Sequence, residues 1–366
     1  MQKIFRLGKN ILICPLNWGL GHATRCVPII RALCNQGHKV IIAADKGPLA
    51  FLRKAFPNLE FIELPGFEPR YSRSNTQVFK LMASFPKALI AFRKDHKAVE
   101  SIVKSHKIDV VISDNRFGCW SNEVPSVFIT HQLHIQVPKI WRWATPFINI
   151  FNNSYINKYD EVWVPDSEYE PSLGGELSHP APSRYKISYI GNLSRFKAEN
   201  QEVTEKSIKY LVILSGPEPQ RTMLEELVLK QAQQIKDKVL ILRAKPDFKD
   251  LPDNIPGNVK MFNHVDDEMF VKLVNSAENI VCRGGYSSLM DLVRLNKSAY
   301  LVPTPGQTEQ EYLAKHLGEI GHFGWCKQSD FQLDKVTTPF VSLKDNYRDD
   351  ENSIEYFIQI WSENLN

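Results

Sequence analysis

One segment near the start of the chain carries the strongest structural signal: Asn17-Trp18-Gly19-Leu20-Gly21-His22-Ala23-Thr24-Arg25. It follows the apolar run 11–14 and precedes Val27, Ile30 and Leu33, which recur at helical spacing. This pattern predicts a strand, a glycine turn and a helix, whose unpaired N-terminal amides can hold a negative or oxygen-rich group. The segment is therefore a candidate binding loop, although short glycine turns also serve ordinary packing in α/β proteins.

A second glycine turn lies far along the chain, in Val281-Cys282-Arg283-Gly284-Gly285-Tyr286-Ser287-Ser288-Leu289-Met290-Asp291. We expect Ser287 and Ser288 to cap a helix and to donate hydrogen bonds to phosphate oxygens, aided by the helix dipole. Asp291 falls about one turn inside this helix, where a carboxylate can accept hydrogen bonds from two ribose hydroxyls. The alternative is an acid that only complements the helix dipole.

A polar cluster opens a further helix after the apolar run 299–302. Side chains of this kind suit the hydroxyls of a sugar, whereas simple capping of the helix is the alternative. The members of the cluster are Gln307, Thr308, Glu309 and Gln310.

Together these segments resemble, in order along nearly the whole chain, the motifs of GT-B glycosyltransferases. The resemblance is to family 28, the UDP-N-acetylglucosamine transferases of lipid-linked peptidoglycan precursor synthesis. The matching segments are Gly21-His22 (N-terminal loop), Leu214-Ser215-Gly216 (phosphate loop), His264-Val265-Asp266-Asp267 (beside the uracil), and Arg283 to Asp291 with Gln310-Glu311 (nucleotide-sugar motif). Departures from the family pattern bear on the donor sugar: Leu20 replaces a glycine, Asp291 the ribose glutamate and Glu311 a glutamine.

The resemblance implies an α/β protein of the GT-B fold, in which two Rossmann-like doubly wound domains face a cleft and a C-terminal helix crosses back to the first domain. It implies an inverting, metal-independent enzyme without a cofactor, for which the UDP-sugar is a substrate. Expected donor-binding residues are Gly21, Ser215, Gly216, Arg221, Val265, Gly284, Gly285, Ser287, Ser288, Asp291, Gln307, Thr308, Glu309 and Gln310. Expected acceptor-binding residues are Trp18, His131 and Gln132.

The order of apolar runs independently favours two parallel α/β domains, because strand-like runs alternate with longer segments. The first series of runs is 11–14, 39–43, 61–64, 110–113, 126–130, 161–164 and 187–190; the second is 210–214, 239–242, 259–262, 279–282 and 299–302. We therefore expect an acceptor domain at 1–190, a polar linker at 191–206, a nucleotide-sugar domain at 207–345 and a terminal segment at 346–366. The terminal segment contains the one-sided apolar helix 353–361.

Candidate catalytic residues follow the strands of the first domain. His22 comes directly after the glycine turn and titrates near neutrality, so we expect it to act as general base, with helix capping as the alternative. Asp114 follows another strand and is expected to orient His22 or to act as base itself, although loop aspartates are common turn formers. His131 and Gln132 follow the strand 126–130 and resemble the family's acceptor-contacting pair.

On the donor side, the leaving diphosphate needs amides, hydroxyls and fixed cations. Ser215 and Gly216 supply the first two, and Arg221 is the favoured cation. Arg243 and Arg283 are reserves, with surface salt bridging as the ordinary explanation for each. No Asp-x-Asp follows a strand, which disfavours a metal-chelating mechanism.

Composition agrees with an enzyme of two domains. The chain has 366 residues, of which 43% are hydrophobic and 23% charged. Six cysteines without a CxxC pair favour reduced thiols in a cytoplasmic protein over zinc or disulfides. The short N-terminal apolar run predicts a first strand and not a signal peptide. The net charge of +4 without a basic stripe does not support nucleic-acid binding.

Two segments of the first domain combine basic and aromatic residues, at 79–97 and 137–151. Such segments can lie on the anionic inner face of the cytoplasmic membrane, or they can be core helices with charged outer faces. Two of them in the acceptor domain favour peripheral membrane contact and a lipid-linked acceptor.

We therefore expect a glycosyltransferase that moves a sugar, N-acetylglucosamine by resemblance, from a UDP-sugar to a hydroxyl acceptor in cell-envelope glycan synthesis. An alternative is a UDP-sugar hydrolase, because residues 19–26 also resemble the loop of the hydrolase of pseudaminic acid synthesis. A second alternative is a nucleotide-sugar-binding module without catalysis.

Overall fold

The computed structural model describes residues 8–67, 77–137, 143–179, 186–197, 207–216, 218–245, 248–343, 347 and 353–365. Contacts within the chain divide it into two compact units. Unit 1 comprises residues 1–70, 81–195 and 349–366, and unit 2 comprises residues 71–80 and 196–348. The division between residues 195 and 196 falls inside the segment 191–206 that we proposed as linker, of which 198–206 lie outside the described residues.

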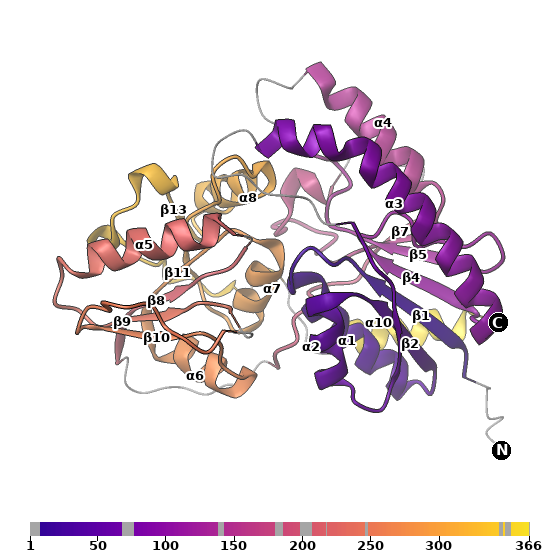
Figure 1. Ribbon diagram of the computed structural model, residues 1–366, viewed down its shortest axis with the longest axis horizontal. Coiled ribbons are helices and arrows are strands. Elements are labelled where there is room, and N and C mark those ends of the chain that lie inside the picture. Colours follow the sequence, from indigo (N-terminus) through magenta and orange to yellow (C-terminus); the bar gives the residue numbers. More distant parts are fainter. Residues whose placement is uncertain are drawn as a thin grey trace. The chain divides into compact units, whose positions relative to one another are not determined.

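Unit 1 is built on a seven-stranded parallel sheet with the strand order β3-β2-β1-β4-β5-β6-β7 (Figure 1). The strands are β1 (Asn10–Pro15), β2 (Lys39–Ala44), β3 (Glu60–Glu63), β4 (Val110–Asp114), β5 (Ser126–Ile129), β6 (Glu161–Val164) and β7 (Ile187–Tyr189). Each corresponds to a strand predicted from the sequence. The order reverses between β1 and β4, and in open α/β sheets ligands bind at the carboxyl ends of the strands at such a reversal.

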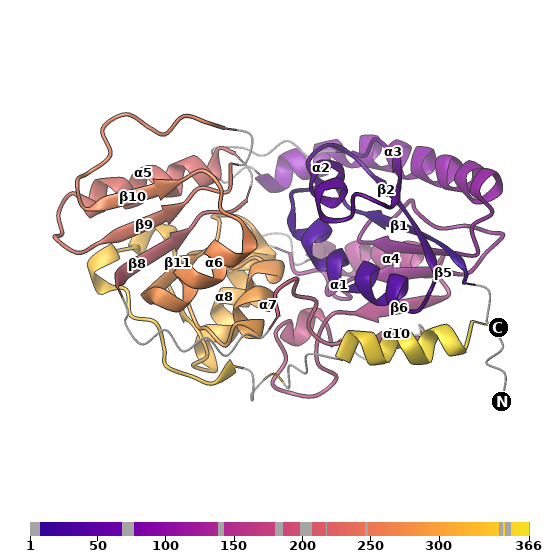
Figure 2. The ribbon, with the colours of Figure 1, turned by 90° about the horizontal axis from the view of Figure 1, so that it is seen from below.

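Helices cover both faces of this sheet. They are α1 (Gly21–Asn35), α2 (Lys46–Ala55), α3 (Gln77–His106), α4 (Thr145–Ile156), α10 (Ser353–Glu363) and the 3-10 turn η2 (Gly175–Leu177). On one face α3 packs through Val99, Ile102 and Val103 against β1, β2 and β4. Beside it Ile156 of α4 packs in a cluster with Phe128 of β5. The helices α1 and α10 contact each other (Figure 2).

The terminal helix α10 packs on unit 1, as the family resemblance implied. Along β6 side chains alternate, so that Val162 and Val164 join the cluster of α4 while Trp163 points to the opposite face. There the indole of Trp163 meets the rings of Phe357 and Trp361 edge-on, at centroid distances of 5.1 and 5.0 Å. This aromatic contact, together with the contacts between α10 and α1, fixes α10 on the sheet.

Unit 2 holds a six-stranded parallel sheet with the order β10-β9-β8-β11-β12-β13. Its strands are β8 (Ile208–Ile213), β9 (Val239–Leu242), β10 (Val259–Phe262), β11 (Ala277–Cys282), β12 (Tyr300–Leu301) and β13 (Gly324–Trp325). Five of these match sequence-predicted strands, and β13 was missed because two residues show no periodicity. The order reverses between β8 and β11, which places the second ligand-binding edge there.

The helical elements of unit 2 are α5 (Gln220–Ala232), α6 (Asp267–Ser276), α7 (Tyr286–Arg294), α8 (Thr308–Glu319) and the 3-10 turns η3 (Gln328–Asp330) and η4 (Leu333–Lys335). The core on one face joins Leu224 and Val228 of α5 to Val212 of β8 and Ile241 of β9. As Figure 1 shows, α5 and α6 lie on opposite sides of this sheet. Unit 2 is therefore a second doubly wound domain.

The ring contact between Trp361 and Trp163 predicts that Trp361→Ala strongly destabilises the protein. The Trp361 side chain is only 8% exposed. Removing it should lower the free energy of unfolding by about 3–5 kcal/mol, because a buried aromatic ring leaves a cavity. Tyr356→Ala on the same helix, where the ring is 66% exposed, is the matched control and should change stability by about 0.5 kcal/mol or less. Urea denaturation of both variants checks this, and equal effects would contradict it.

Candidate functional site

Side chains from three strand ends meet at the reversal point of the unit 1 sheet. Pro15 at the end of β1 lies in register with Asp114, the last residue of β4. The helix α1 begins at Gly21 after the glycine turn, and His22 is its second residue. His131 and Gln132 follow β5, which pairs with β4. The structure therefore brings His22, Asp114, His131 and Gln132 to one edge of the sheet.

Asp114 is the centre of this cluster. Its carboxylate, with none of its side chain exposed, accepts from Arg25 Nε at 2.7 Å through Oδ2, and from Arg25 Nη2 through Oδ1. His22 Nδ1 lies 3.3 Å from Asp114 Oδ1, and the Cys26 thiol donates to Oδ2 at 3.6 Å. His22 and Arg25 stand three residues apart, and Cys26 one further, so one face of α1 presents all three to the carboxylate.

The charge states of these groups follow from their surroundings. Burial disfavours the ionised form of Asp114, but the charge of Arg25, the proximity of His22 and their hydrogen bonds outweigh it and hold the pKa of Asp114 well below its usual value. The pKa of His22 is lowered from 6.5, first by burial and then by Arg25, against the opposing effect of Asp114. His22 is therefore a neutral imidazole at neutral pH, and 17% of its side chain remains exposed.

The other predicted acceptor residues flank this cluster. Arg25 Nη1 lies 3.3 Å from His131 Nδ1, and the amide nitrogen of Gln132 lies 3.5 Å from His131 Nε2. Trp18 sits in the glycine turn, donates from its indole nitrogen to the carbonyl of Phe67 at 2.6 Å and keeps 38% of its surface exposed. An exposed indole in this turn offers an apolar face to a bound molecule.

In unit 2 the predicted donor residues gather at the carboxyl ends of the strands. Ser215 and Gly216 follow β8, Val265 follows β10, and Gly284 and Gly285 follow β11. Gly216 has a φ of 91°, a left-handed conformation that glycine adopts without strain. The helices α5, α7 and α8 begin in the same set of connections, and the positive ends of their dipoles favour an anion at this edge.

Two details correct the sequence prediction. Helix α7 begins at Tyr286, and Gly285 occupies its N-cap without a side-chain hydrogen bond, so Ser287 and Ser288 lie within the first turn and do not cap the helix. Thr308, Glu309 and Gln310 form the first turn of α8 after Gln307, as expected. However, the Gln310 side chain is buried and its oxygen accepts from the Thr304 amide at 2.9 Å, so part of this residue supports the loop itself.

A cationic cluster stands at the start of α5. Glu218 accepts from Arg221 Nη2 at 2.7 Å, from the Thr222 hydroxyl at 2.8 Å and from Lys245 Nζ at 3.2 Å. Burial opposes ionisation, but these hydrogen bonds prevail and lower the pKa of Glu218 to about 2. The single carboxylate of Glu218 thus pairs with two cations, Arg221 and Lys245, which leaves this cluster near Gly216 with a net positive charge.

The two reserve arginines are internal. Arg243 forms a bidentate pair with Glu225, at 2.8 and 2.9 Å. Arg283 is fully buried and donates to the carbonyls of Gln220, Val302 and Pro303 and to the side-chain oxygen of Gln328. Burial lowers the pKa of Arg283 to about 10, and these recorded partners are uncharged oxygens.

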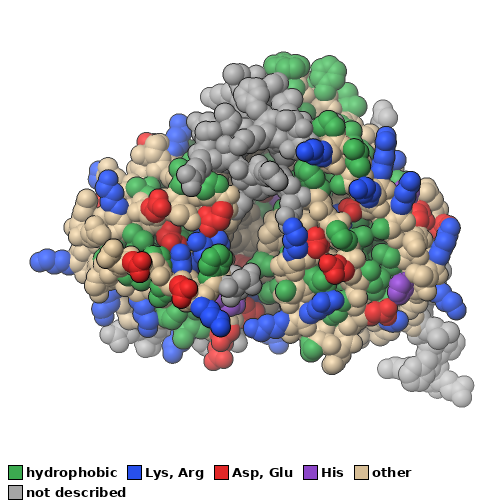
Figure 3. Space-filling view, viewed as in Figure 1, with side chains coloured by type: hydrophobic (Ala, Val, Ile, Leu, Met, Phe, Trp, Pro, Cys, Tyr) green, Lys and Arg blue, Asp and Glu red, His purple; other side chains and the backbone are tan. Residues whose placement is uncertain are grey.

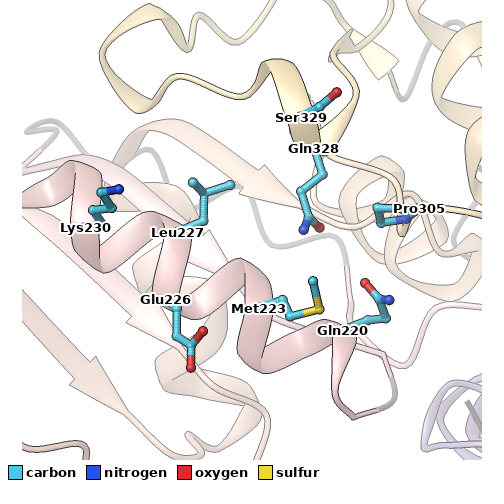
Figure 4. A pocket seen from close by; sticks show the side chains of 8 residues that line it. All are labelled: Gln220, Met223, Glu226, Leu227, Lys230, Pro305, Gln328 and Ser329. Atoms are coloured by element: carbon cyan, nitrogen blue, oxygen red, sulfur yellow. The ribbon is translucent and has the colours of Figure 1, made fainter. Parts of the chain in front are cut away.

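A groove of about 510 Å³ lies on unit 2 between α5 and η3. Figure 4 shows its lining: Gln220, Met223, Glu226, Leu227 and Lys230 from α5, and Pro305, Gln328 and Ser329 opposite. No predicted donor residue lines it. Arg283, which follows β11, connects the groove to the carboxyl ends of the strands, because it donates to the Gln220 carbonyl and to the Gln328 side chain.

Sequence reasoning assigned no role to Arg25 and did not single out Lys245. Arg25 stands within the quoted N-terminal segment, and its signal was its position three residues after His22 on the same predicted helix. Lys245 follows β9 in a loop that also contains exposed Phe248, and nothing in that pattern pointed to Glu218.

Within the described ranges, no three His, Cys, Asp or Glu side chains gather so as to hold a metal ion. Of the helices that the structure describes, none has the length and apolar character needed to cross a membrane.

Comparisons with known proteins agree with this architecture. Residues 10–138 match glycosyl transferase family 1, and residues 210–355 match the glycosyltransferase family 28 C-terminal domain. An uncharacterized glycosyltransferase of Methanosarcina acetivorans is 24% identical over 338 residues, covering 86% of this chain and 82% of its own.

Two further relatives bear on the fold and the family. The UDP-N-acetylglucosamine–N-acetylmuramyl-(pentapeptide) pyrophosphoryl-undecaprenol N-acetylglucosamine transferase of Listeria welshimeri is 22% identical, covering 81% of this chain and 80% of its own. The solved structure of Acinetobacter baumannii MurG superposes with a TM-score of 0.57 at 15% identity, covering 97% of this chain and 99% of that one. The chain is a glycosyltransferase of the GT-B fold, and its second half is a glycosyltransferase family 28 C-terminal domain.

Proposed function

We propose that this glycosyltransferase transfers a sugar, N-acetylglucosamine in the first instance, from a UDP-sugar to a hydroxyl acceptor of cell-envelope glycan synthesis, with inversion and without a metal. The observation that carries the proposal is the contact of His22 Nδ1 with the buried carboxylate of Asp114. The named activity of the Listeria welshimeri relative supports the choice of donor.

On the acceptor side, His22 is the general base. Asp114 accepts from Nδ1, so the Nε2 lone pair is left to take the proton of the acceptor hydroxyl as its oxygen attacks the anomeric carbon. Asp114 itself is fully buried and both of its oxygens are bonded, which suits it to orienting His22 and not to receiving the proton. Trp18, His131 and Gln132 are assigned to the acceptor.

On the donor side, unit 2 stabilises the diphosphate as it leaves. Ser215 and Gly216 precede α5, and Arg221 with Lys245 supplies positive charge held in place by Glu218. Val265 offers its backbone to the uracil and Asp291 binds the ribose. The remaining donor residues, Gly21, Gly284, Gly285, Ser287, Ser288, Gln307, Thr308, Glu309 and Gln310, are assigned to the phosphates and the sugar.

The reaction class is tested with purified protein and UDP-sugars, with and without a lipid extract. Transfer predicts UDP release that depends on the extract, together with a labelled lipid product. UDP release without any acceptor would indicate the hydrolase, and tight nucleotide binding without turnover would contradict catalysis.

We predict that His22→Ala lowers the rate of transfer by about two to four orders of magnitude, the range for a lost general base, while UDP affinity changes little. His22→Asn should fail to restore the rate, because an amide cannot accept the proton. In the wild type the rate should rise with pH through the pKa of His22, with a midpoint below 6.5 because the neutral ring is the base. A variant that keeps most of its turnover, or an acid limb unchanged in His22→Asn, would contradict the role.

For the donor site we predict that Asp291→Ala weakens UDP binding by about 10- to 100-fold, the worth of a charge-assisted hydrogen-bond pair of about 1.5–3 kcal/mol. Asp291→Glu is the matched control, since it keeps the carboxylate, and it should bind UDP more tightly than Asp291→Ala. Calorimetric titration with UDP measures both. Unchanged affinity in a folded Asp291→Ala variant would remove Asp291 from the ribose site.

We also propose that the face formed by α3 and α4 contacts an anionic membrane, where a lipid-linked acceptor resides. Trp143, Phe147 and Ile150 recur on one side of α4 and its preceding turn and are 67%, 69% and 66% exposed. Helix α3 packs beside α4 through Phe92 and Tyr155. Figure 3 shows apolar side chains gathered over α4 with basic ones beside them over α3. Of the two segments predicted to be basic and aromatic, residues 138–142 lie outside the described part.

The membrane proposal predicts binding to vesicles that contain anionic lipid. Phe147→Ser with Ile150→Ser should reduce the bound fraction at least severalfold, because inserted apolar surface is lost. Tyr356→Ser with Ile360→Ser, which removes exposed apolar side chains from α10, is the matched control and should leave binding unchanged. Co-sedimentation measures both pairs, and equal binding by wild type and the α4 variant would refute the assignment.

A further inference from the structure

We propose that Arg25 is a positioning residue that holds His22 and His131 in opposite tautomers. The edge of unit 1 then carries one imidazole that accepts a hydrogen bond through Nε2 and one that donates through Nε2. The inference rests on the proposed function for the role of His22 as base. The tautomers themselves are a property of the protein without substrate.

The tautomer of His131 follows from the chemistry of Arg25. A guanidinium carries N–H donors and no acceptor, and it stays charged. Its Nε and Nη2 donate to Asp114, while Nη1 lies 3.3 Å from His131 Nδ1. A guanidinium nitrogen can bond to a ring nitrogen only if that ring nitrogen holds a lone pair. His131 Nδ1 is therefore unprotonated, and the proton of the neutral ring is on Nε2. The Gln132 amide nitrogen, 3.5 Å from Nε2, is a donor and cannot bond a protonated ring nitrogen, so this tautomer requires the amide to turn its oxygen toward Nε2.

The tautomer of His22 follows from the same arginine through Asp114. Because Arg25 pairs with both carboxylate oxygens, Asp114 stays ionised and can only accept. His22 Nδ1, at 3.3 Å from Asp114 Oδ1, must then be the protonated nitrogen. Its Nε2 keeps the lone pair.

The charge balance of the cluster favours a single proton on His22. The charged groups that act on this ring are Arg25 from α1 and Asp114 from β4, with His131 beyond them. The charges of the arginine and the aspartate cancel, so a second proton on His22 adds an uncompensated charge in a buried site. The lowered pKa of His22 agrees with this balance.

The tautomers are read directly from the full-length protein labelled with ¹⁵N-histidine, by long-range ¹H–¹⁵N correlation at neutral pH. The signals are assigned with His22→Gln and His131→Gln. We expect His22 protonated at Nδ1 and His131 protonated at Nε2. Either ring in the other tautomer, or averaging between the two in the wild type, would overturn the proposal, and this measurement needs no variant of Arg25.

The variant Arg25→Lys tests whether Arg25 fixes the tautomer of His131. A lysine keeps the charge but a single ammonium cannot span both Asp114 and His131. We expect His22 to stay protonated at Nδ1, while the His131 signals lose their fixed tautomer and average. A His131 tautomer unchanged in Arg25→Lys would overturn the assignment to Arg25.

Arg116→Lys is the matched control. Arg116 and Arg25 are both 2% exposed, and Arg116 forms its own bidentate pair with Asp95 at 2.9 Å for both contacts. Both histidines should keep their wild-type tautomers in this variant, and a change in them would overturn the specific role of Arg25. If both histidines have the expected tautomers but the protein shows no transferase activity, the proposed function is rejected and this inference stands. If the enzyme is active but either tautomer differs, this inference is rejected and the proposed function stands.

Discussion

The ion pair between Arg25 and Asp114 is the interaction on which the cluster of His22, Asp114 and His131 in unit 1 depends. A carboxylate taken out of water without a partner costs several kcal/mol, and the bidentate arginine offsets that cost. Because the pair fixes the plane of the carboxylate, it also fixes the direction from which His22 is held. The base that we propose, His22, is therefore oriented through a contact between residues 89 positions apart in the chain.

Two other buried arginines also form bidentate pairs with carboxylates, but in the described part of the chain no histidine shares those carboxylates. Arg116 pairs with Asp95 and also donates to the carbonyls of Leu64 and Pro65, which ties α3 to the loops after β3 and β4. Arg243 pairs with Glu225 and holds the Asn263 side chain at 2.7 Å. Both join helices to strand ends. The comparison separates the structural use of a buried arginine pair from its use at Asp114, where one oxygen is shared with an imidazole.

Apolar runs predicted the strands other than β13 and the two binding edges, because such runs record what must be buried. The one-sided apolar pattern of α10 predicted that it packs on something, and the family resemblance implied its return to the first domain. The sequence also placed His22, Asp114 and His131 at strand ends, and neighbouring parallel strands bring such residues together. It could not show that Arg25 would take both oxygens of Asp114, since pairing at that separation leaves no local pattern. The capping role predicted for Ser287 and Ser288 failed because Gly285 already occupies the N-cap of α7.

Charged side chains are paired differently in the two units, and this difference agrees with the acceptor and donor roles that we propose for them. In unit 1 the charges of Arg25 and Asp114 cancel, so the edge is suited to a neutral hydroxyl and to an uncharged base. In unit 2 Glu218 serves both Arg221 and Lys245, and Arg283 is bonded to uncharged oxygens. Positive charge held at fixed positions favours an anionic ligand. The arrangement therefore agrees with the diphosphate that we propose for unit 2, whose negative charge grows as the glycosidic bond breaks.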